Sequence, residues 1–491
     1  MIPVVDLFAG PGGLGEGFCS FKKNSIFNII LSVEKEKFAC ETLLLRSFFH
    51  QFKKKPNDYY DYLKGNISKD KLFSKYPKKY LKAKNSILNI EMGVGKNSLI
   101  VSDTIKQLIP NQKQHWILLG GPPCQAYSIA GRSKLKNLKG VENFEKDKRH
   151  TLYKQYLQII SKNGPSVFIM ENVKGLISSK IKGKSTLTNI LMDLKFPDKT
   201  FKNIENKEYN LFSFNDENDL FAEDNNFIIN CSEHGVPQRR QRIFIVGIKK
   251  DLNIKGLTSL KKEEEVPIHK VLSDLPKIRS IISKETDSHQ NWIKIFENLS
   301  TTDEKLLLQA KKEALTINEF GSLYIKTKKE VCKYRPDWFH DGQLGGVLNH
   351  ETRRYLKGDI ERYIYASIFA DKNNTSIKIS DFPKKLLPNH KNIYSDKIIF
   401  SDRFRVQLRN LPATTITSHI SKDGHYYIHY DASQARSLTV REAARIQTFP
   451  DNYFFEGNKT QQYVQVGNAV PPLIANKIAA IIFNDVFKKI N

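Results

Sequence analysis

Short apolar runs recur through the first half of the chain, separated by longer stretches with helical periodicity. The runs cover residues 4–8, 29–33, 99–101, 116–119, 167–170, 227–229 and 243–246. Each run has the length of a strand and is bounded by Gly, Pro, Asn or Asp. Apolar strands that alternate with helices are typical of a parallel sheet buried on both faces. The pattern therefore predicts an α/β fold with a Rossmann-like, doubly wound sheet.

Polar and irregular stretches interrupt this rhythm. Residues 48–97 are rich in Lys, Tyr and Asn and are interpreted as an insertion, as are residues 203–226. Residues 256–433 carry scattered basic, aromatic and histidine residues without a clear period, so we expect a second, smaller domain there. The first domain then spans residues 1–255 and resumes in residues 434–491. Two lobes also suit a chain of 491 residues, because single domains usually have about 100 to 200.

The end of the chain returns to strong helical periodicity. Thr439 is a candidate N-cap for a helix over residues 437–449, with Glu442 three positions on in capping-box spacing. A last helix is expected after Pro471 and Pro472. Its apolar residues share one face: Ile474, Ile478, Ile481, Ile482 and Val486. We expect this helix to pack back on the first lobe.

Basic residues outnumber acidic ones, with 78 Lys and Arg against 52 Asp and Glu and a formal net charge of +26. Such an excess makes a polyanion, above all nucleic acid, the first partner to consider. Biased codon usage would explain a Lys-, Asn- and Ile-rich chain equally well, so the motifs must decide. Hydrophobic residues make up 40% of the chain, which excludes wholesale disorder and a fibrous repeat.

Cysteine usage and the apolar runs suggest the compartment. The five cysteines are far apart and never have the short spacing of zinc ligands: Cys19, Cys40, Cys124, Cys231 and Cys332. Neither a disulfide framework nor a metal site is expected. The N-terminus lacks the features of a signal peptide, and no run approaches the roughly 20 apolar residues that span a bilayer. We expect a soluble, cytoplasmic protein without a membrane partner.

A glycine-rich turn follows the first predicted strand. Gly10, Gly12 and Gly15 have the spacing of a dinucleotide fingerprint, and Glu34 lies at the end of the second strand, where a ribose-binding acid belongs. Glycine lets the backbone turn tightly against a ligand, and a carboxylate accepts the ribose hydroxyl protons. These residues predict a nucleoside cofactor. Alone, they leave a nicotinamide oxidoreductase as an open alternative.

The residues around these glycines resemble a known family. The run DLFAGPGGL at residues 6–14 is similar to the first motif of the cytosine-C5 DNA methyltransferases, which bind S-adenosylmethionine on a class I methyltransferase fold. Further motifs of that family follow in the same order: GPPCQAYS at 121–128, ENV at 171–173, QRRQR at 238–242, RSLT with REAARIQTFP at 436–450, and QVGNAVP at 465–471. The resemblance frames nearly the whole chain and leaves only the insertions and the second lobe unmatched.

The resemblance implies a catalytic set of Cys124, Glu171, Arg240 and Arg242. Cytosine C5 is a poor nucleophile until a group adds to C6, and a thiolate at Cys124 would be that group. Cys124 follows two prolines at a strand end, and a nearby positive charge would lower its pKa from about 8.5. Glu171 would bond N3 and the amino group of the base, Arg242 would face the pyrimidine, and Arg240 would support the catalytic loop or the backbone.

The resemblance also implies how S-adenosylmethionine would bind. Phe8 would stack on adenine, Glu34 would bind the ribose, and Asn468 would close the methionine end of the pocket. Asp103 is assigned to the adenine amino group from an expected strand-end position, with residues 65–67 as the competing choice. Lys35 stands where the family often has a second aromatic residue. The remaining cofactor-binding residues are Gly10, Gly12, Gly13, Leu14, Pro122 and Val470.

The second lobe resembles a target-recognition domain, and its PATTIT run at 412–417 resembles the signature that meets DNA near the flipped base. The residues expected to contact DNA are Gln125, Ser128, Arg240, Thr415 and Ile416. The resemblance implies transfer of a methyl group to C5 of a flipped cytosine in double-stranded DNA, with release of S-adenosylhomocysteine. It also implies a monomeric bacterial methylase that is either part of a restriction-modification system, with an endonuclease for the same site as its companion, or an orphan enzyme. A tRNA cytosine methyltransferase and a catalytically silent DNA-binding regulator are the alternatives.

Overall fold

The computed structural model describes most of the chain. The described residues are 1–111, 113–123, 152–178, 180–181, 184–201, 206–215, 224–327, 332–388 and 402–490. Three residues expected at the site, Cys124, Gln125 and Ser128, lie outside these ranges.

An eight-stranded sheet forms the centre of the first lobe in the described part of the chain. Its strand order is β3-β2-β1-β4-β5-β11-β8, and β9 pairs along β11. The strands are β1 (Ile2–Leu7), β2 (Phe27–Glu34), β3 (Ile87–Asn89), β4 (Ile117–Gly120), β5 (Val167–Val173), β8 (Tyr209–Phe212), β9 (Ile228–Asn230) and β11 (Gln241–Lys249). The neighbouring strands β3, β2, β1, β4 and β5 run parallel to one another, whereas β11 is antiparallel to β5, β8 and β9. The predicted α/β, doubly wound architecture is confirmed, and the order reverses between β1 and β4, beside which such sheets bind ligands.

One predicted strand is wrong. Residues 99–101 lie in the helix α6 (Asn97–Leu108), not in the sheet. The strand at the β2 edge is β3, which falls within the stretch that was interpreted as an insertion. A run of three apolar residues fits a helix turn and a strand equally well, and only the partner across the sheet decides between them.

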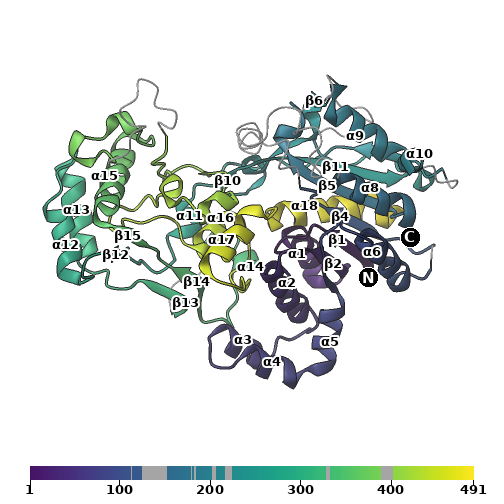
Figure 1. The fold of residues 1–491 in the computed structure, drawn as a ribbon, viewed down its shortest axis with the longest axis horizontal. Helices are drawn as coiled ribbons and strands as arrows, with labels where there is room; N and C mark the ends of the chain where they lie inside the picture. Colours follow the sequence, from purple (N-terminus) through teal and green to yellow (C-terminus); the bar gives the residue numbers. More distant parts are fainter. Residues whose placement is uncertain are drawn as a thin grey trace.

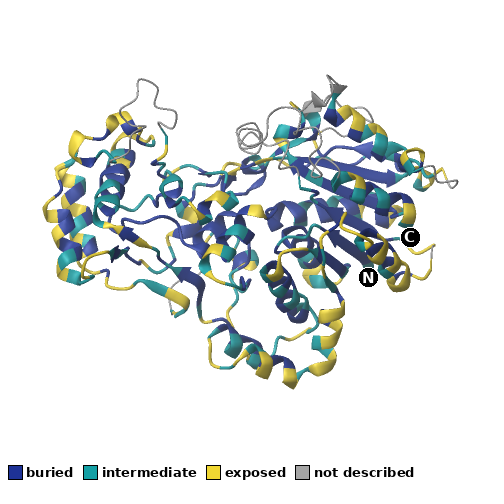
Figure 2. Cartoon of the chain, viewed as in Figure 1, coloured by how far each residue is buried: buried dark blue, intermediate teal, exposed yellow. Residues whose placement is uncertain are grey.

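Alternate strand residues face two different helix layers. Val4 packs with Leu14 and Phe18 of α1 (Gly13–Ser20). Its neighbour Val5 packs with Val101 of α6 on the opposite face. The second layer also contains α8 (Leu152–Asn163), α9 (Thr186–Lys195) and α10 (Pro197–Phe201). Figure 2 shows the strands as the most continuously buried part of this lobe.

The terminal helix α18 (Pro472–Ile482) packs on α1, as predicted. A Cβ added at Gly17 would lie 2.4 Å from both the Ala475 Cβ and the Pro472 carbonyl oxygen. The glycine therefore permits the close approach of the two helices. Beyond α18 the chain continues through a π-helical turn (Phe483–Phe487) and α19 (Lys488–Ile490).

The segment Lys459–Ile490 is long and apolar enough to cross a membrane by length and composition alone, with a mean hydropathy of 1.4 in its most apolar window. This differs from the expectation that no such run exists. However, 67% of that window is buried inside the protein. Such burial is what a core helix of the first lobe requires, and α18 occupies that position.

Between α2 (Lys37–His50) and β3, three short helices form a separate layer (Figure 1). They are α3 (Asn57–Leu63), α4 (Lys69–Lys75) and α5 (Pro77–Asn85). Their apolar residues share a core with Phe48 and Phe49 of α2 and with Leu344 and Leu348 from the second lobe. We call residues 51–85 the α3–α5 insertion.

The second lobe divides into two packed clusters. Its outer cluster joins α12 (His289–Glu297), α13 (Glu304–Ala314) and α15 (Lys357–Asn373), beside the short strands β12 (Ile281–Ser283) and β15 (Arg354–Leu356). The inner cluster joins α11 (His269–Leu272), α14 (Pro336–Phe339), β14 (Gly346–Glu351) and β16 (Ala413–Thr414) to α16 (Val440–Ile446) and α17 (Lys459–Asn468). Strand β13 (Gly321–Lys326) pairs with β14, and β10 (Gln238–Arg239) pairs with β16. In Figure 1, α16 and α17 stand between the outer helices and the sheet.

The predicted start of the helix after residue 437 is confirmed. The Thr439 side chain accepts a hydrogen bond from the Glu442 N–H, and the Glu442 carboxylate accepts one from the Thr439 N–H. This capping box satisfies donors that would otherwise be unpaired at the helix start.

Candidate active site

The turn after β1 is held in conformations that favour glycine. Gly10 has a φ of 56° and Gly12 a φ of 92°, and Phe8 between strand and turn also has a positive φ of 56°. The Gly10 N–H donates to Glu34 Oε2 over 2.8 Å. Glu34 Oε1 accepts from two backbone N–H groups, those of Lys35 and Glu36. The end of β2 therefore braces the glycine turn through one carboxylate.

Space around the glycines differs from one to the next. Among the described residues beyond its two chain neighbours, no atom lies within 4 Å of a Cβ added at Gly10, so the volume next to it is open. At Gly13 an added Cβ would lie only 2.2 Å from the Val470 carbonyl oxygen. The structure therefore brings Gly13 and Val470 together. Asn468, two residues before Val470, is exposed at the end of α17. The Leu14 side chain instead belongs to the core under α1.

Asp6, at the end of β1 beneath this turn, is only 1% exposed. Burial raises the pKa of its carboxyl group to about 7, although the nearby Gly15 backbone opposes the shift and Glu34 adds to it. Removing a carboxylate from water disfavours its charged form. Asp6 was not among the expected site residues.

Asp103 does not lie at a strand end, contrary to the expectation. It is exposed on α6, which begins eight residues after β3 ends. The residues beside Glu34 are instead those that end β3. Asn89 Nδ2 donates to the carbonyl oxygens of Glu34 and Lys35, over 3.1 and 2.9 Å, and the Ile90 N–H donates to Glu34 over 3.0 Å. These residues were missed because their strand was not predicted.

Glu171 and Arg242 form an ion pair at the edge where β5 ends and β11 begins. Arg242 Nε lies 2.9 Å from Glu171 Oε1, and the two side chains are 12% and 13% exposed. The antiparallel register sets Arg242 opposite Val173 and Glu171 opposite Phe244. The pair is thus nearly desolvated yet still reachable at one side.

The segment that leads into the predicted catalytic loop runs against this pair. A Cβ added at Gly121 would lie 2.8 Å from Glu171 Oε2. Asn172 Nδ2 donates to the carbonyl oxygen of buried Pro122 over 3.4 Å. Gly121 and Pro122, which precede the predicted catalytic loop, therefore lie directly beside Glu171 and Asn172.

Arg240 is buried and has other partners. Its two terminal nitrogens donate to the carbonyl oxygens of Ile416 and Ala469, each over 2.8 Å, and its side chain is 1% exposed. Burial lowers the pKa of its guanidinium to about 9. The structure thus shows the Arg240 side chain buried, and its direct contact with DNA stays a prediction. Arg240 links the PATTIT run to the segment after α17.

The PATTIT run is fixed along β10. Thr415 Oγ1 donates to the Arg239 carbonyl oxygen over 2.8 Å, and the Ile416 N–H donates to Gln238 Oε1 over 2.6 Å. The Ile416 side chain is fully buried, and its contact with DNA likewise stays a prediction. Thr415 is partly exposed and stays beside the Arg239–Arg242 segment.

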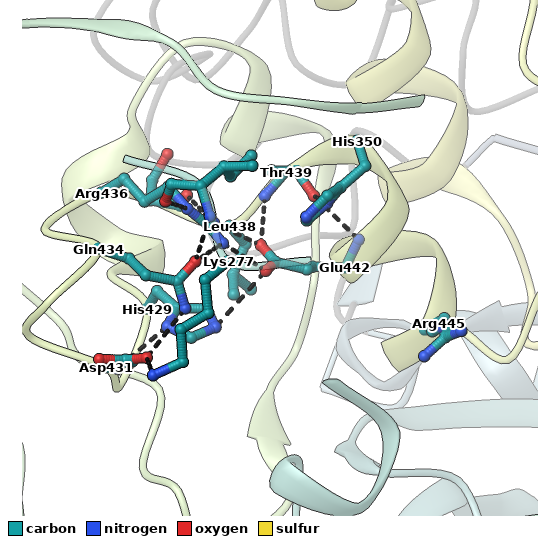
Figure 3. Close-up of polar contacts among 12 residues, drawn as sticks. Lys277, His350, His429, Asp431, Gln434, Arg436, Leu438, Thr439, Glu442 and Arg445 are labelled. Atoms are coloured by element: carbon teal, nitrogen blue, oxygen red, sulfur yellow. Dashed lines mark hydrogen bonds and ion pairs between the residues drawn. The ribbon is translucent and has the colours of Figure 1, made fainter. Parts of the chain in front are cut away.

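A buried polar network joins α16 to the second lobe (Figure 3). Arg436 and Glu442 form a two-pronged ion pair, with both nitrogen–oxygen distances 2.7 Å. His429 Nε2 lies 3.5 Å from Glu442 Oε1. On the far side, His350 contacts Thr439 Oγ1 over 2.9 Å. Burial alone would raise the pKa of the Glu442 carboxyl, but the charge and hydrogen bond of Arg436, together with the nearby His429 and His350, hold it well below its usual range.

Among the described residues, no group of three or more His, Cys, Asp or Glu side chains could hold a metal ion.

Comparison with known proteins agrees with this arrangement. The family model described as C-5 cytosine-specific DNA methylase matches residues 78–484. The type II methyltransferase M.Bpa9945I of Bacillus paralicheniformis is 34% identical, over 98% of each chain. M.DdeI of Desulfomicrobium norvegicum is 26% identical over 97% of this chain and 87% of its own.

One solved structure shows the same fold over 99% of this chain and 100% of its own, with a TM-score of 0.54 and 19% identity. It is a putative DNA modification methyltransferase encoded within a prophage in E. coli. The sheet, the glycine turn and the Glu171–Arg242 pair are thus set in a chain that matches one family model over most of its length. The chain belongs to the C-5 cytosine-specific DNA methylases.

Proposed function

We propose that the protein methylates C5 of a flipped cytosine within a specific sequence of double-stranded DNA. The observation that carries this proposal is the Glu171–Arg242 pair beside the segment that leads into Cys124. The pair supplies a carboxylate and a guanidinium at one sheet edge, and Cys124 is assigned as the thiol that addition to a cytosine ring also requires.

The proposed reaction begins with the Cys124 thiolate, which adds to C6 of the base. Glu171 favours protonation at N3, so electron density moves to C5. Arg242 orients the Glu171 carboxylate through their 2.9 Å contact and faces the pyrimidine. After methylation, loss of the C5 proton to a base restores the double bond, and the Cys124 thiolate leaves.

S-adenosylmethionine, when bound, supplies the methyl group and leaves as S-adenosylhomocysteine. The residues present fit such a ligand, because the volume beside Gly10 is open and Glu34 is oriented by three backbone N–H groups. Phe8 is assigned to the adenine ring and Asn468 to the methionine end. The backbone of the turn, which includes Gly12, Gly13 and Leu14, would line the pocket with Pro122 and Val470.

At the adenine end we replace Asp103 with Asn89 and Ile90. Both hydrogen bonds of Asn89 Nδ2 go to backbone carbonyl groups. Asn89 Oδ1 is therefore the atom left to accept a hydrogen bond from the adenine amino group. Ile90, like Phe8, is partly buried against the core and offers an apolar edge.

We assign residues 256–433 to DNA recognition and Thr415, Gln125 and Ser128 to contacts near the flipped base. The net charge of +26 suits a phosphate-rich partner. By likeness to type II methyltransferases, we place the protein in a restriction-modification system, as a cytoplasmic bacterial monomer. Its companion is a restriction endonuclease that acts on the same site without being a subunit.

Bisulfite sequencing tests the proposal. A plasmid is recovered from a methylation-free host that expresses either the intact protein or Cys124→Ala. We expect protected cytosines in one short sequence context, with the intact protein only. Absence of protected cytosines, although the soluble protein binds S-adenosylmethionine, would reject DNA as the substrate and favour tRNA or a silent regulator.

A further inference from the structure

The α3–α5 insertion contacts the second lobe through a buried tyrosine. The Tyr60 hydroxyl on α3 donates to Asp341 Oδ2 over 2.8 Å. The same oxygen accepts a hydrogen bond from Asn452 Nδ2 over 2.7 Å. Leu344 and Leu348 add apolar contacts between the insertion and the second lobe. One carboxylate oxygen of the second lobe is therefore shared by the insertion and by the loop between α16 and α17.

A second tyrosine of α3 holds the other end of that loop. The Tyr62 hydroxyl donates to Glu456 Oε1 over 2.6 Å, and Lys69 on α4 lies 3.2 Å from the same oxygen. On the opposite side, the Glu456 N–H donates to Thr42 of α2 over 2.9 Å. Residues 452–456 are thus bound at both ends by groups that Tyr60 and Tyr62 reach.

Residues 452–456 in turn touch the glycine turn. The hydroxyl of buried Tyr453 donates to the Pro11 carbonyl oxygen. A Cβ added at Gly12 would lie 3.1 Å from the same hydroxyl, so the ring directly supports the turn. Arg46 on α2 continues the contact, since it donates to Asn452 Oδ1 over 2.9 Å and pairs with Glu16 of α1 over 2.6 Å.

We propose that Tyr60 and Tyr62 are positioning residues for the cofactor site, acting through residues 452–456 and Tyr453 on the glycine turn. The α3–α5 insertion would then set the turn and the second lobe relative to each other, instead of serving as a solvated addition. This inference rests on the proposed role of the glycine turn in binding S-adenosylmethionine. Neither tyrosine needs to touch the ligand, because their hydroxyl groups act on Asp341 and Glu456.

The double variant Tyr60→Phe with Tyr62→Phe removes both hydroxyl groups and keeps the rings. Tyr76→Phe is the matched control, because the Tyr76 hydroxyl bonds Asp58 within the insertion itself. The full-length proteins are titrated with S-adenosylhomocysteine by calorimetry, well below their unfolding temperatures. We expect the double variant to bind about three- to tenfold more weakly, and Tyr76→Phe to bind like the unaltered protein.

Hydrogen exchange gives an independent reading of the same variants. The Gly12 N–H bonds the Ala9 carbonyl oxygen over 2.9 Å, and amides in residues 9–14 should exchange faster in the double variant only. Unchanged affinity and exchange in the folded double variant would overturn the inference, and so would equal weakening by Tyr76→Phe. If the unaltered protein itself fails to bind S-adenosylhomocysteine, the proposed cofactor is wrong, which is a different result.

Discussion

Mild acid should destabilise the junction between α16 and the second lobe, because two buried histidines there are held neutral. His429 Nδ1 accepts the Asp431 N–H over 3.0 Å, so its single proton lies on Nε2, which faces Glu442. His350 Nε2 donates to the Pro276 carbonyl oxygen over 2.8 Å, and its Nδ1 accepts from the Thr439 hydroxyl. A second proton on Nδ1 of either ring would face a group that already donates a hydrogen bond to that nitrogen, which is the Asp431 N–H for His429 and the Thr439 hydroxyl for His350.

The pKa of both imidazoles is lowered to about 4. Burial is the main cause; Glu442 opposes it and Arg436 adds to it. The unfolded chain therefore binds protons below about pH 6.5 that the folded chain does not, so stability is full above that pH and is lost as the pH falls. Between pH 7.5 and pH 5.5 each histidine should remove about 1.4 kcal/mol of unfolding free energy, or about 3 kcal/mol together.

Urea unfolding followed by tryptophan fluorescence at these two pH values measures the effect. Other groups also titrate, so the quantity to compare is the loss between the two pH values in the unaltered protein and in His429→Gln. The variant is expected to be less stable at pH 7.5 but to lose about 1.4 kcal/mol less on acidification. Equal losses in the two proteins would show that His429 is not held neutral, and the reasoning from its contacts would be refuted.

Three further changes have defined outcomes. Asp6→Asn should stabilise the protein at pH 8 by up to about 4 kcal/mol. Burial raises the pKa of Asp6 to about 7, so the free-energy cost of ionising the buried carboxyl grows as the pH rises from about 4. Thermal unfolding at several pH values should show that the added stability of the variant vanishes near pH 4. Arg242→Ala should lower the methyl-transfer rate at least about 100-fold by leaving Glu171 without its 2.9 Å partner, as measured with radiolabelled S-adenosylmethionine; a rate within tenfold of normal would contradict this role. Gly17→Ala should cost about 1 to 3 kcal/mol in thermal unfolding, since the new methyl group would meet Ala475 at 2.4 Å, and an unchanged midpoint would contradict that close approach.

Several parts of the site follow from local sequence. The positive φ at Gly10 and Gly12 belongs to a turn of a few residues, and glycine spacing indicates it directly. The Thr439–Glu442 capping box joins two residues three positions apart, and the sequence predicts it equally directly. The pairing of Glu171 with Arg242 was implied only by the family resemblance, because it depends on two strands about 70 residues apart coming into register.

The errors lie where distant partners decide the outcome. Residues 99–101 form a helix, whereas Ile87–Asn89 becomes a strand because β2 lies beside it. Asp103 was assigned to the adenine amino group because a strand was expected to end there, and its position on α6 removes that reason. Arg240 and Ile416 are expected to contact DNA, and the structure shows both side chains buried next to the paired strands β10 and β16.

The sequence by itself determined the class of fold, the order of the motifs and the residues that turn and cap the chain, because these depend on neighbours within a few positions. Only the tertiary structure decided which polar side chains lose water, and therefore that the pKa of Asp6 is raised to about 7 while the pKa of His429 is lowered to about 4. It also decided that the α3–α5 insertion reaches the loop beneath the glycine turn. Both the burial of a side chain and these contacts depend on residues up to several hundred positions apart in the chain, so no local sequence pattern predicts them.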